Sequence, residues 1–195
     1  MRSLLVCIIM AFVILYCTGC KKDDSSNPQS ISGNWNFIGL RATTSTIYTY
    51  NDAGVMSSNI TTSRYTASEY SGSVKISGST LTGDSIKYYA QDTVLFMQYD
   101  DNEVVDSLQQ IEYISTPPVS SVSNFEQIGS DSLHFTDQPL LSAGDGPAAT
   151  GAKFSITGNI MTLTTNMVNN QNNNSGGVAI TMHQTANVVV LLQRQ

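Results

Sequence analysis

Catalysis in this chain would have to use very few titratable side chains. Only two histidines occur, His134 and His183, so general acid–base catalysis could draw on at most a single histidine–carboxylate pair. A histidine-rich metal site is excluded for the same reason. The chain also lacks a Gly-x-Ser-x-Gly turn, a phosphate-cradling glycine loop and a His-Glu-x-x-His sequence. We interpret both histidines as surface positions on strands, and we expect a protein that is not an enzyme and needs no cofactor.

The densest acidic cluster comprises Asp100, Asp101, Glu103 and Asp106. Carboxylate oxygens are the ligands that Ca²⁺ prefers. The cluster lacks the alternating ligand spacing and the glycine of a calcium-binding loop, however. We therefore predict a solvated turn here, and no metal site.

Tyrosines are the side chains that most suggest binding. Tyr48 and Tyr50 are two residues apart, so on a strand they lie on the same face. Together with Tyr88 and Tyr99 they could line a cavity for a small apolar or amphipathic ligand, because each ring carries a hydroxyl group. The same tyrosines could equally be half-buried partners that pack across neighbouring strands. The sequence leaves both interpretations open.

Composition limits the partners that these side chains could serve. The 195 residues carry a formal net charge of -6, with 41% hydrophobic and only 12% charged residues. This apolar content is enough for the core of one domain. Binding of duplex nucleic acid needs a basic face that displaces counterions from phosphates. We therefore expect no nucleic-acid partner.

The elements that must position the tyrosines are short antiparallel strands. Residues 73–77 alternate polar and apolar side chains and lead through Gly78-Ser79 into 80–82, which predicts a hairpin. Residues 153–157 and 160–165 predict a second hairpin around Gly158-Asn159. Further strands are expected at 33–40, 44–50, 60–65, 85–89, 93–99, 107–114, 132–135, 178–183 and 187–192, the last two joined by a turn at 184–186. These segments predict an all-β fold class.

Three segments are not wholly accounted for by this strand pattern. Residues 103–111 overlap the strand expected at 107–114, and one or two short helical turns are the alternative for them. The asparagine-rich residues 169–177 are too polar to contribute to a core, so we predict a mobile hairpin loop there. Residues 142–147 predict a second long loop.

The N-terminus has the three parts of a secretory signal. Arg2 precedes an apolar run over residues 4–16, and small residues follow before Cys20. The run is too short to span a bilayer as a helix. Thr18-Gly19-Cys20 resembles the lipobox of bacterial lipoproteins, which implies cleavage before Cys20 and lipidation of that cysteine. The predicted organisation is a signal peptide at 1–19, a lipidated cysteine with a flexible tether at 20–30, and a folded domain at 31–195.

The residues after Cys20 carry a second resemblance. Lys21, Lys22, Asp23 and Asp24 resemble the lysine-plus-acidic export signal of Bacteroidota lipoproteins. That resemblance implies an outer-membrane protein held by its N-terminal lipid and facing the cell exterior.

The folded domain opens with Gly33-Asn34-Trp35. This resembles the Gly-x-Trp of lipocalin-like domains, which places the tryptophan at the closed end of an up-and-down antiparallel barrel. In that family an arginine covers the indole, and Arg194 follows the last predicted strand. A guanidinium over an indole contributes about 0.5 to 2 kcal/mol. The resemblance implies a calycin-like barrel in which Gly33, Trp35 and Arg194 close one end.

Two functions are compatible with these observations. The first is a non-enzymatic surface lipoprotein that binds a small apolar or amphipathic ligand inside the barrel. The alternative is a structural or interaction subunit of an envelope complex, with a barrel filled by side chains and an envelope protein as its partner. Inward-facing polar residues would favour the ligand, and interleaved aliphatic residues would favour the filled barrel.

Overall fold

The structure of the protein is a computed structural model that describes residues 30–52, 54–137 and 149–195. The chain divides into residues 1–30 and the unit Ile31–Gln195, and the account below concerns the second unit. The signal, Cys20, the charged residues 21–24 and the predicted loop at 142–147 lie outside the described residues. Within the described ranges, no helix has the length and apolar character needed to cross a membrane.

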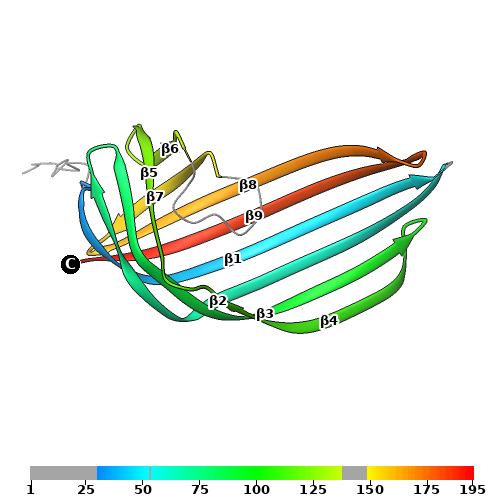
Figure 1. Ribbon diagram of the computed structural model, residues 1–195, viewed down its shortest axis with the longest axis horizontal. Coiled ribbons are helices and arrows are strands. Elements are labelled where there is room, and N and C mark those ends of the chain that lie inside the picture. Colours follow the sequence, from blue (N-terminus) through cyan, green and yellow to red (C-terminus); the bar gives the residue numbers. More distant parts are fainter. Residues whose placement is uncertain (1–29, 53, 138–148) are drawn as a thin grey trace, which may run out of the picture. The chain divides into compact units, whose positions relative to one another are not determined.

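The unit Ile31–Gln195 is built from antiparallel strands (Figure 1), which confirms the predicted all-β class. The strands in the described residues are β1 (Gly33–Asp52), β2 (Val55–Ser77), β3 (Thr80–Asp100), β4 (Glu103–Ser115), β5 (Val119–Ile128), β6 (Ser132–Phe135), β7 (Gly151–Thr157), β8 (Ile160–Ser175) and β9 (Val178–Arg194).

The sheet follows the predicted up-and-down order and closes into a ring. Its strand order is β2-β1-β9-β8-β7-β6-β5-β3-β4, and an additional pairing of β2 with β3 closes the ring and leaves β4 outside it. Strand β3 has two successive neighbours: its first part, from Thr80 to Ile86, pairs with β5, and its second part, from Tyr89 to Asp100, pairs with β4. Pro117 and Pro118 separate β4 from β5, because proline has no N–H to donate to a sheet ladder.

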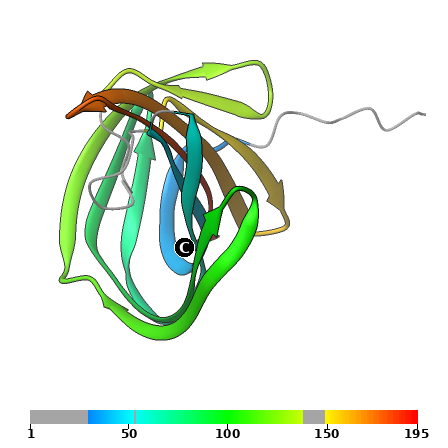
Figure 2. The ribbon, with the colours of Figure 1, turned by 90° about the vertical axis from the view of Figure 1, so that its right-hand side faces the viewer.

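The ring is complete over only part of the length of the strands. Strand β7 pairs with β8 from Ile160 to Thr164, so the rest of β8 pairs with β9 alone among the described strands. Long parts of β1, β2, β3, β4, β8 and β9 continue together beyond the short strands β5, β6 and β7 (Figures 1 and 2). We call the closed part the barrel region and the continuation the open sheet, whose edges are β4 and β8.

Several strands are longer than the sequence predicts. The expected turn at residues 184–186 is wrong, because β9 runs through them with Gln184 opposite Thr46 on β1 and opposite Asn169 on β8. The two strands expected at 33–40 and 44–50 form the single strand β1, and those expected at 60–65 and 73–77 form β2. The three strands expected at 80–82, 85–89 and 93–99 form β3. The polar residues between these segments do not end the strands, because β1, β2 and β3 each pair with a neighbouring strand on both sides.

Two further predictions about local structure are wrong. The asparagine-rich segment is not a loop, since residues 169–174 belong to β8 and pair with β9 up to Ser175 opposite Val178. Residues 103–111 are not helical, since they form most of β4. In both segments the ladder to a neighbouring strand satisfies the backbone polar groups, which local composition does not report.

The hydrophobic core lies in the barrel region. Along β1 the buried side chains are Trp35, Phe37, Leu40 and Ala42, with a register shift against β9 between Phe37 and Gly39. Large side chains from other strands are fully buried against them: Val74, Ile76, Leu81, Met161 and Leu192. The strands therefore hold one another mainly through this end of the unit.

Candidate binding site

One end of the barrel region is closed by Trp35 and Arg194. The two residues are directly opposite each other on β1 and β9, and the guanidinium carbon of Arg194 lies 4.5 Å from the centre of the indole ring. Trp35 is fully buried, and its Nε1 donates a hydrogen bond to the carbonyl oxygen of Ile31 at 3.0 Å. Gly33 has a φ of 140°, which side-chain-bearing residues rarely adopt. The arrangement is the one that the Gly-x-Trp resemblance implies for these three residues.

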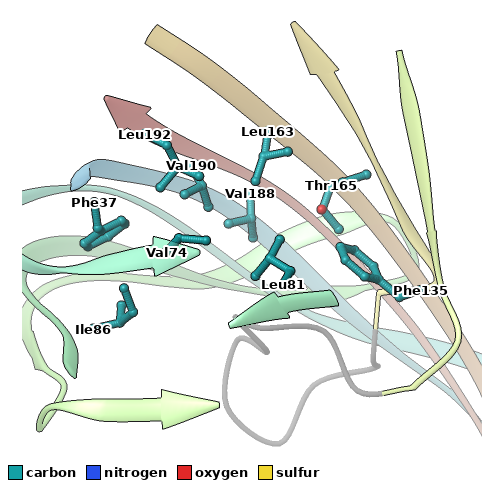
Figure 3. A pocket seen from close by; sticks show the side chains of 11 residues that line it. Phe37, Val74, Leu81, Ile86, Phe135, Leu163, Thr165, Val188, Val190 and Leu192 are labelled. Carbon is teal, nitrogen blue, oxygen red and sulfur yellow. The ribbon is translucent and has the colours of Figure 1, made fainter. Parts of the chain in front are cut away.

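The interior of the barrel region is filled by side chains. Its remaining cavity has a volume of about 40 Å³ and is lined by apolar groups such as Phe37, Leu81 and Phe135 (Figure 3). Sites for organic ligands usually measure about 300 to 1,000 Å³. This cavity between the described residues is therefore too small for such a ligand.

A larger hollow lies over the open sheet and involves strands β1, β2, β3 and β4. It has a volume of about 450 Å³, and we call it the trough. Its lining combines aromatic rings, amides, hydroxyls, a carboxylate and aliphatic or thioether side chains: Tyr48, Tyr50, Asn59, Ile60, Thr61, Phe96, Met97, Gln98, Asp106, Ser107 and Leu108. The size and the chemistry of the trough suit a ligand.

Cross-strand register places the key trough residues on one face of the sheet. Tyr48 lies opposite Asn59, and Tyr50 lies opposite Ser57. Asn59 in turn lies opposite Gln98 on β3. Directly opposed residues share a face, so the two rings and the two amides project to the same side. Tyr48 is 38% exposed, which leaves its ring accessible to a ligand.

Of the four tyrosines considered as candidates for lining a cavity, Tyr48 and Tyr50 line the trough. Tyr88 packs against the barrel core and lies near Tyr65. Tyr99 alternates with Gln98 along β3, so it projects from the opposite face of the sheet, where its hydroxyl lies 3.6 Å from the sulfur of Met97. Tyr88 and Tyr99 therefore lie outside the trough, because the strand register, which the sequence does not give, separates them from Tyr48.

A buried polar cluster lies between the barrel core and the trough. Asp92 is 3% exposed; its carboxylate accepts hydrogen bonds from the Ser63 hydroxyl and from the backbone N–H of Arg64, the latter at 3.0 Å. Tyr65 lies opposite Asp92 in the β2–β3 pairing. Burial, together with the nearby Tyr88 and Asp92, raises the pKa of the Tyr65 phenol above its ordinary value. Asp92 is thus held as an acceptor by two donors from β2.

Phe96, Asn59 and Gln98 were missed by the sequence reasoning. A usable signal is the alternation of Asp92, Val94, Phe96 and Gln98 along β3. This alternation places the ring of Phe96 and the amide of Gln98 on the same face of β3 as the buried carboxylate of Asp92. Without the pairing of β1 with β2 and of β2 with β3, nothing in the sequence brings this face to Tyr48.

Neither histidine takes part in a catalytic arrangement in the described structure. His134 is exposed on β6 opposite Glu126, and no ion pair joins the two among the described residues. His183 is exposed on β9, and its Nδ1 lies 2.5 Å from the amide oxygen of Asn170. Neither residue lines the trough. The ranges that the structure describes also contain no group of three metal-ligating side chains.

Comparison with known proteins adds little to this geometry. No family model and no curated protein matches the sequence. Among solved structures, the chain is similar to the translocator domain of the autotransporter NalP from Neisseria meningitidis, with 8% identity and a TM-score of 0.20 over 77% of this chain and 88% of that one. A TM-score this low carries no argument about fold or function.

Proposed function

We propose that the protein is a non-enzymatic binding lipoprotein of the outer membrane that holds an amphipathic ligand in its trough. Cys20 is the proposed site of lipidation, and Lys21, Lys22, Asp23 and Asp24 are the proposed export signal to the cell exterior. The observation that carries the binding function is the contrast in volume between about 450 Å³ in the trough and about 40 Å³ in the barrel interior.

The trough lining favours a ligand with both an apolar face and many hydroxyl or amide groups. The rings of Tyr48 and Phe96 offer flat apolar surfaces, while Asn59 and Gln98 offer amide donors and acceptors. A purely apolar ligand would cover these amides without pairing them, which is unfavourable. A segment of an oligosaccharide matches the lining best, because its sugar rings have C–H faces and hydroxyl edges.

The test is binding of neutral oligosaccharides to the full chain in a non-ionic polyoxyethylene detergent. A glycan array selects the saccharide, and titration calorimetry measures its affinity. We expect Tyr48→Ala and Phe96→Ala each to weaken binding by about tenfold or more, equivalent to about 1.4 kcal/mol. Tyr48→Phe separates the contribution of the hydroxyl from that of the ring.

The matched control is Tyr113→Ala on β4. Tyr113 is 66% exposed and stacks on Tyr89, with ring centres 6.2 Å apart, and it does not line the trough. We expect its removal to leave affinity unchanged. Absence of any retained saccharide, or equal losses in the trough variants and in the control, would contradict the proposal.

A second candidate function is that of an interaction subunit in an envelope complex. It is favoured by the edge strand β4, which is exposed along almost its whole length and carries exposed Val104, Val105, Leu108 and Ile111. An unpaired edge is a template for a strand from another protein. Site-specific photocrosslinking from Gln109 in cells tests this function: a single reproducible adduct supports it, and no adduct contradicts it.

A further inference from the structure

A second hollow lies on the face of β1 and β2 that points away from the core. Arg41 and Thr43 are exposed on β1, whereas the intervening Ala42 is buried. On β2, Arg64 and Thr66 are likewise exposed. These four residues, with Asn187 of β9, contribute to the lining of a hollow of about 400 Å³.

The two arginines are close neighbours across the strands. Arg41 lies opposite Thr66, and Thr43 lies opposite Arg64, so the arginines occupy a diagonal pair of positions. Diagonal positions on one face are about 7 to 8 Å apart, within reach of long side chains. Two like charges at this spacing repel each other unless an anion lies between them.

Among the described residues, the side chains directly opposite the two arginines carry no negative charge. The residues directly opposite Arg41 are Thr66 and Val189, and those opposite Arg64 are Thr43 and Thr93. Neither guanidinium forms a hydrogen bond or ion pair with another described residue. This is notable in a chain with 15 acidic and only 9 basic residues other than histidine, where a nearby carboxylate would be the common arrangement.

The carboxylate that contacts this part of the sheet is that of Asp92, and it lies on the face opposite to the two arginine side chains. Asp92 accepts a hydrogen bond from the backbone N–H of Arg64, but Asp92 is buried and the Arg64 side chain is exposed. The contact fixes the backbone from which the Arg64 side chain extends. It leaves the guanidinium available to a ligand.

From this arrangement we propose that the hollow binds a phosphate ester group. Arginine forms two parallel hydrogen bonds to phosphate oxygens, and two guanidiniums match the charge of a phosphomonoester, about −1.5 to −2 at pH 7. The hydroxyls of Thr43 and Thr66 can donate to the remaining oxygens. A hollow of about 400 Å³ is larger than a phosphate ion, so the phosphate would be one end of a larger molecule.

The proposed phosphate site and the trough lie on opposite faces of the sheet. Arg41 and Arg64 alternate with Ala42 and Tyr65, whereas Tyr48 lies on the same face as Ala42 by the two-residue period of β1. Substitutions in one site can therefore be made without changing the other. Failure of the phosphate site would not affect the saccharide test, and the reverse also holds.

The test uses the full chain in a non-ionic detergent and three probes measured by titration calorimetry. The probes are inorganic phosphate, glucose 6-phosphate and the water-soluble lipid dihexanoyl phosphatidic acid. We expect saturable binding that Arg41→Gln and Arg64→Gln each weaken by about tenfold and that the double variant abolishes. Arg64→Lys keeps the charge but loses the two-pronged contact, so it should bind less tightly than the unchanged protein and more tightly than Arg64→Gln.

Lys153→Gln is the matched control, because it removes one exposed positive charge from β7, outside the hollow. We expect it to bind each probe as the unchanged protein does, and the fluorescence of the single tryptophan, Trp35, reports that every variant is folded. Binding of glucose 6-phosphate alone supports a soluble phosphorylated ligand, and binding of phosphatidic acid alone supports a lipid headgroup. The proposal is overturned if no probe binds, or if the folded double variant binds as well as the unchanged protein.

Discussion

The barrel region and the open sheet use the same strands for two different tasks. Along β1 the side chains on the inner face are first Trp35, Phe37, Leu40 and Ala42, all buried. Farther along the same face they are Thr44, Thr46, Tyr48 and Tyr50. Apart from the register shift between Phe37 and Gly39, both parts follow the two-residue period, but the first part faces opposing strands and the second faces a hollow of about 450 Å³.

The difference shows that closure of the sheet depends on the short strands. Where β5, β6 and β7 complete the ring, the inner face is covered and its residues are apolar. Where β4 and β8 are edges, the inner face meets water and its residues are hydroxyl, amide and aromatic groups. We infer that stability resides mainly in the barrel region, and that the open sheet is available for binding.

Trp35→Ala is expected to have the largest effect on the free energy of unfolding, and it tests whether stability resides mainly in the barrel region. Removal of a fully buried aromatic side chain costs about 3 to 5 kcal/mol of unfolding free energy, and Trp35 is fully buried. Tyr113→Ala in the open sheet should change that free energy by less than about 0.5 kcal/mol. Urea unfolding followed by circular dichroism measures both. Equal losses would show that the two regions do not differ in stability.

The boundary between the regions is tested by Asp92→Ala. The substitution leaves the Ser63 hydroxyl and the Arg64 N–H without their acceptor, which costs about 1 to 3 kcal/mol. Asp92→Asn should cost less, because the amide oxygen can accept from the Arg64 N–H and the amide nitrogen can donate to the Ser63 oxygen. Urea midpoints rank the two variants, and a larger loss in Asp92→Asn would contradict this account.

Arg194→Gln measures how much the cation over the indole contributes to the closed end. We expect a loss of about 0.5 to 2 kcal/mol, because the guanidinium lies 4.5 Å from the ring centre. Arg64→Gln removes the same charge from the open sheet, and it should change stability by less than about 0.5 kcal/mol. If the two substitutions have equal effects on the urea midpoint, the contact with Trp35 contributes nothing specific.

The smallest expected effect on the free energy of unfolding is that of Tyr65→Phe, and it is confined to alkaline pH. The pKa of Tyr65 is raised in the folded protein, chiefly by burial, so above pH about 10 the unfolded chain releases this proton more readily than the folded one. Stability that is fully present below that pH is therefore lost as pH rises. Tyr65→Phe should have a shallower decline of unfolding free energy between pH 9 and about 11, whereas Tyr113→Phe should decline like the unchanged protein.

The fold could be predicted from sequence because its pattern is local. Alternation of polar and apolar residues indicated strands, and the resemblance of Gly33-Asn34-Trp35 to lipocalin-like domains implied that Arg194 lies over Trp35. The lengths of the strands could not be predicted in this way. The asparagines of β8 have low strand propensity, and pairing with β9 along its full length outweighs that preference.

The trough could be predicted only in part. Tyr48 and Tyr50 share a face because of their spacing alone. Their neighbours Asn59, Gln98 and Phe96 depend on the registers of β1 with β2 and of β2 with β3. A shift of one residue in either register would send the partners to the opposite face.

The sequence by itself determined the fold class, because the side-chain period of strands is a local pattern. The closure by Trp35 and Arg194 was implied by the resemblance of Gly33-Asn34-Trp35 to lipocalin-like domains. The tertiary structure decided that the barrel interior is filled, that the tyrosines divide between the trough, the core and the opposite face, and that Arg41 and Arg64 lie side by side without a counter-charge. These features depend on register and on where the ring stops closing, which are set by long-range pairing between strands.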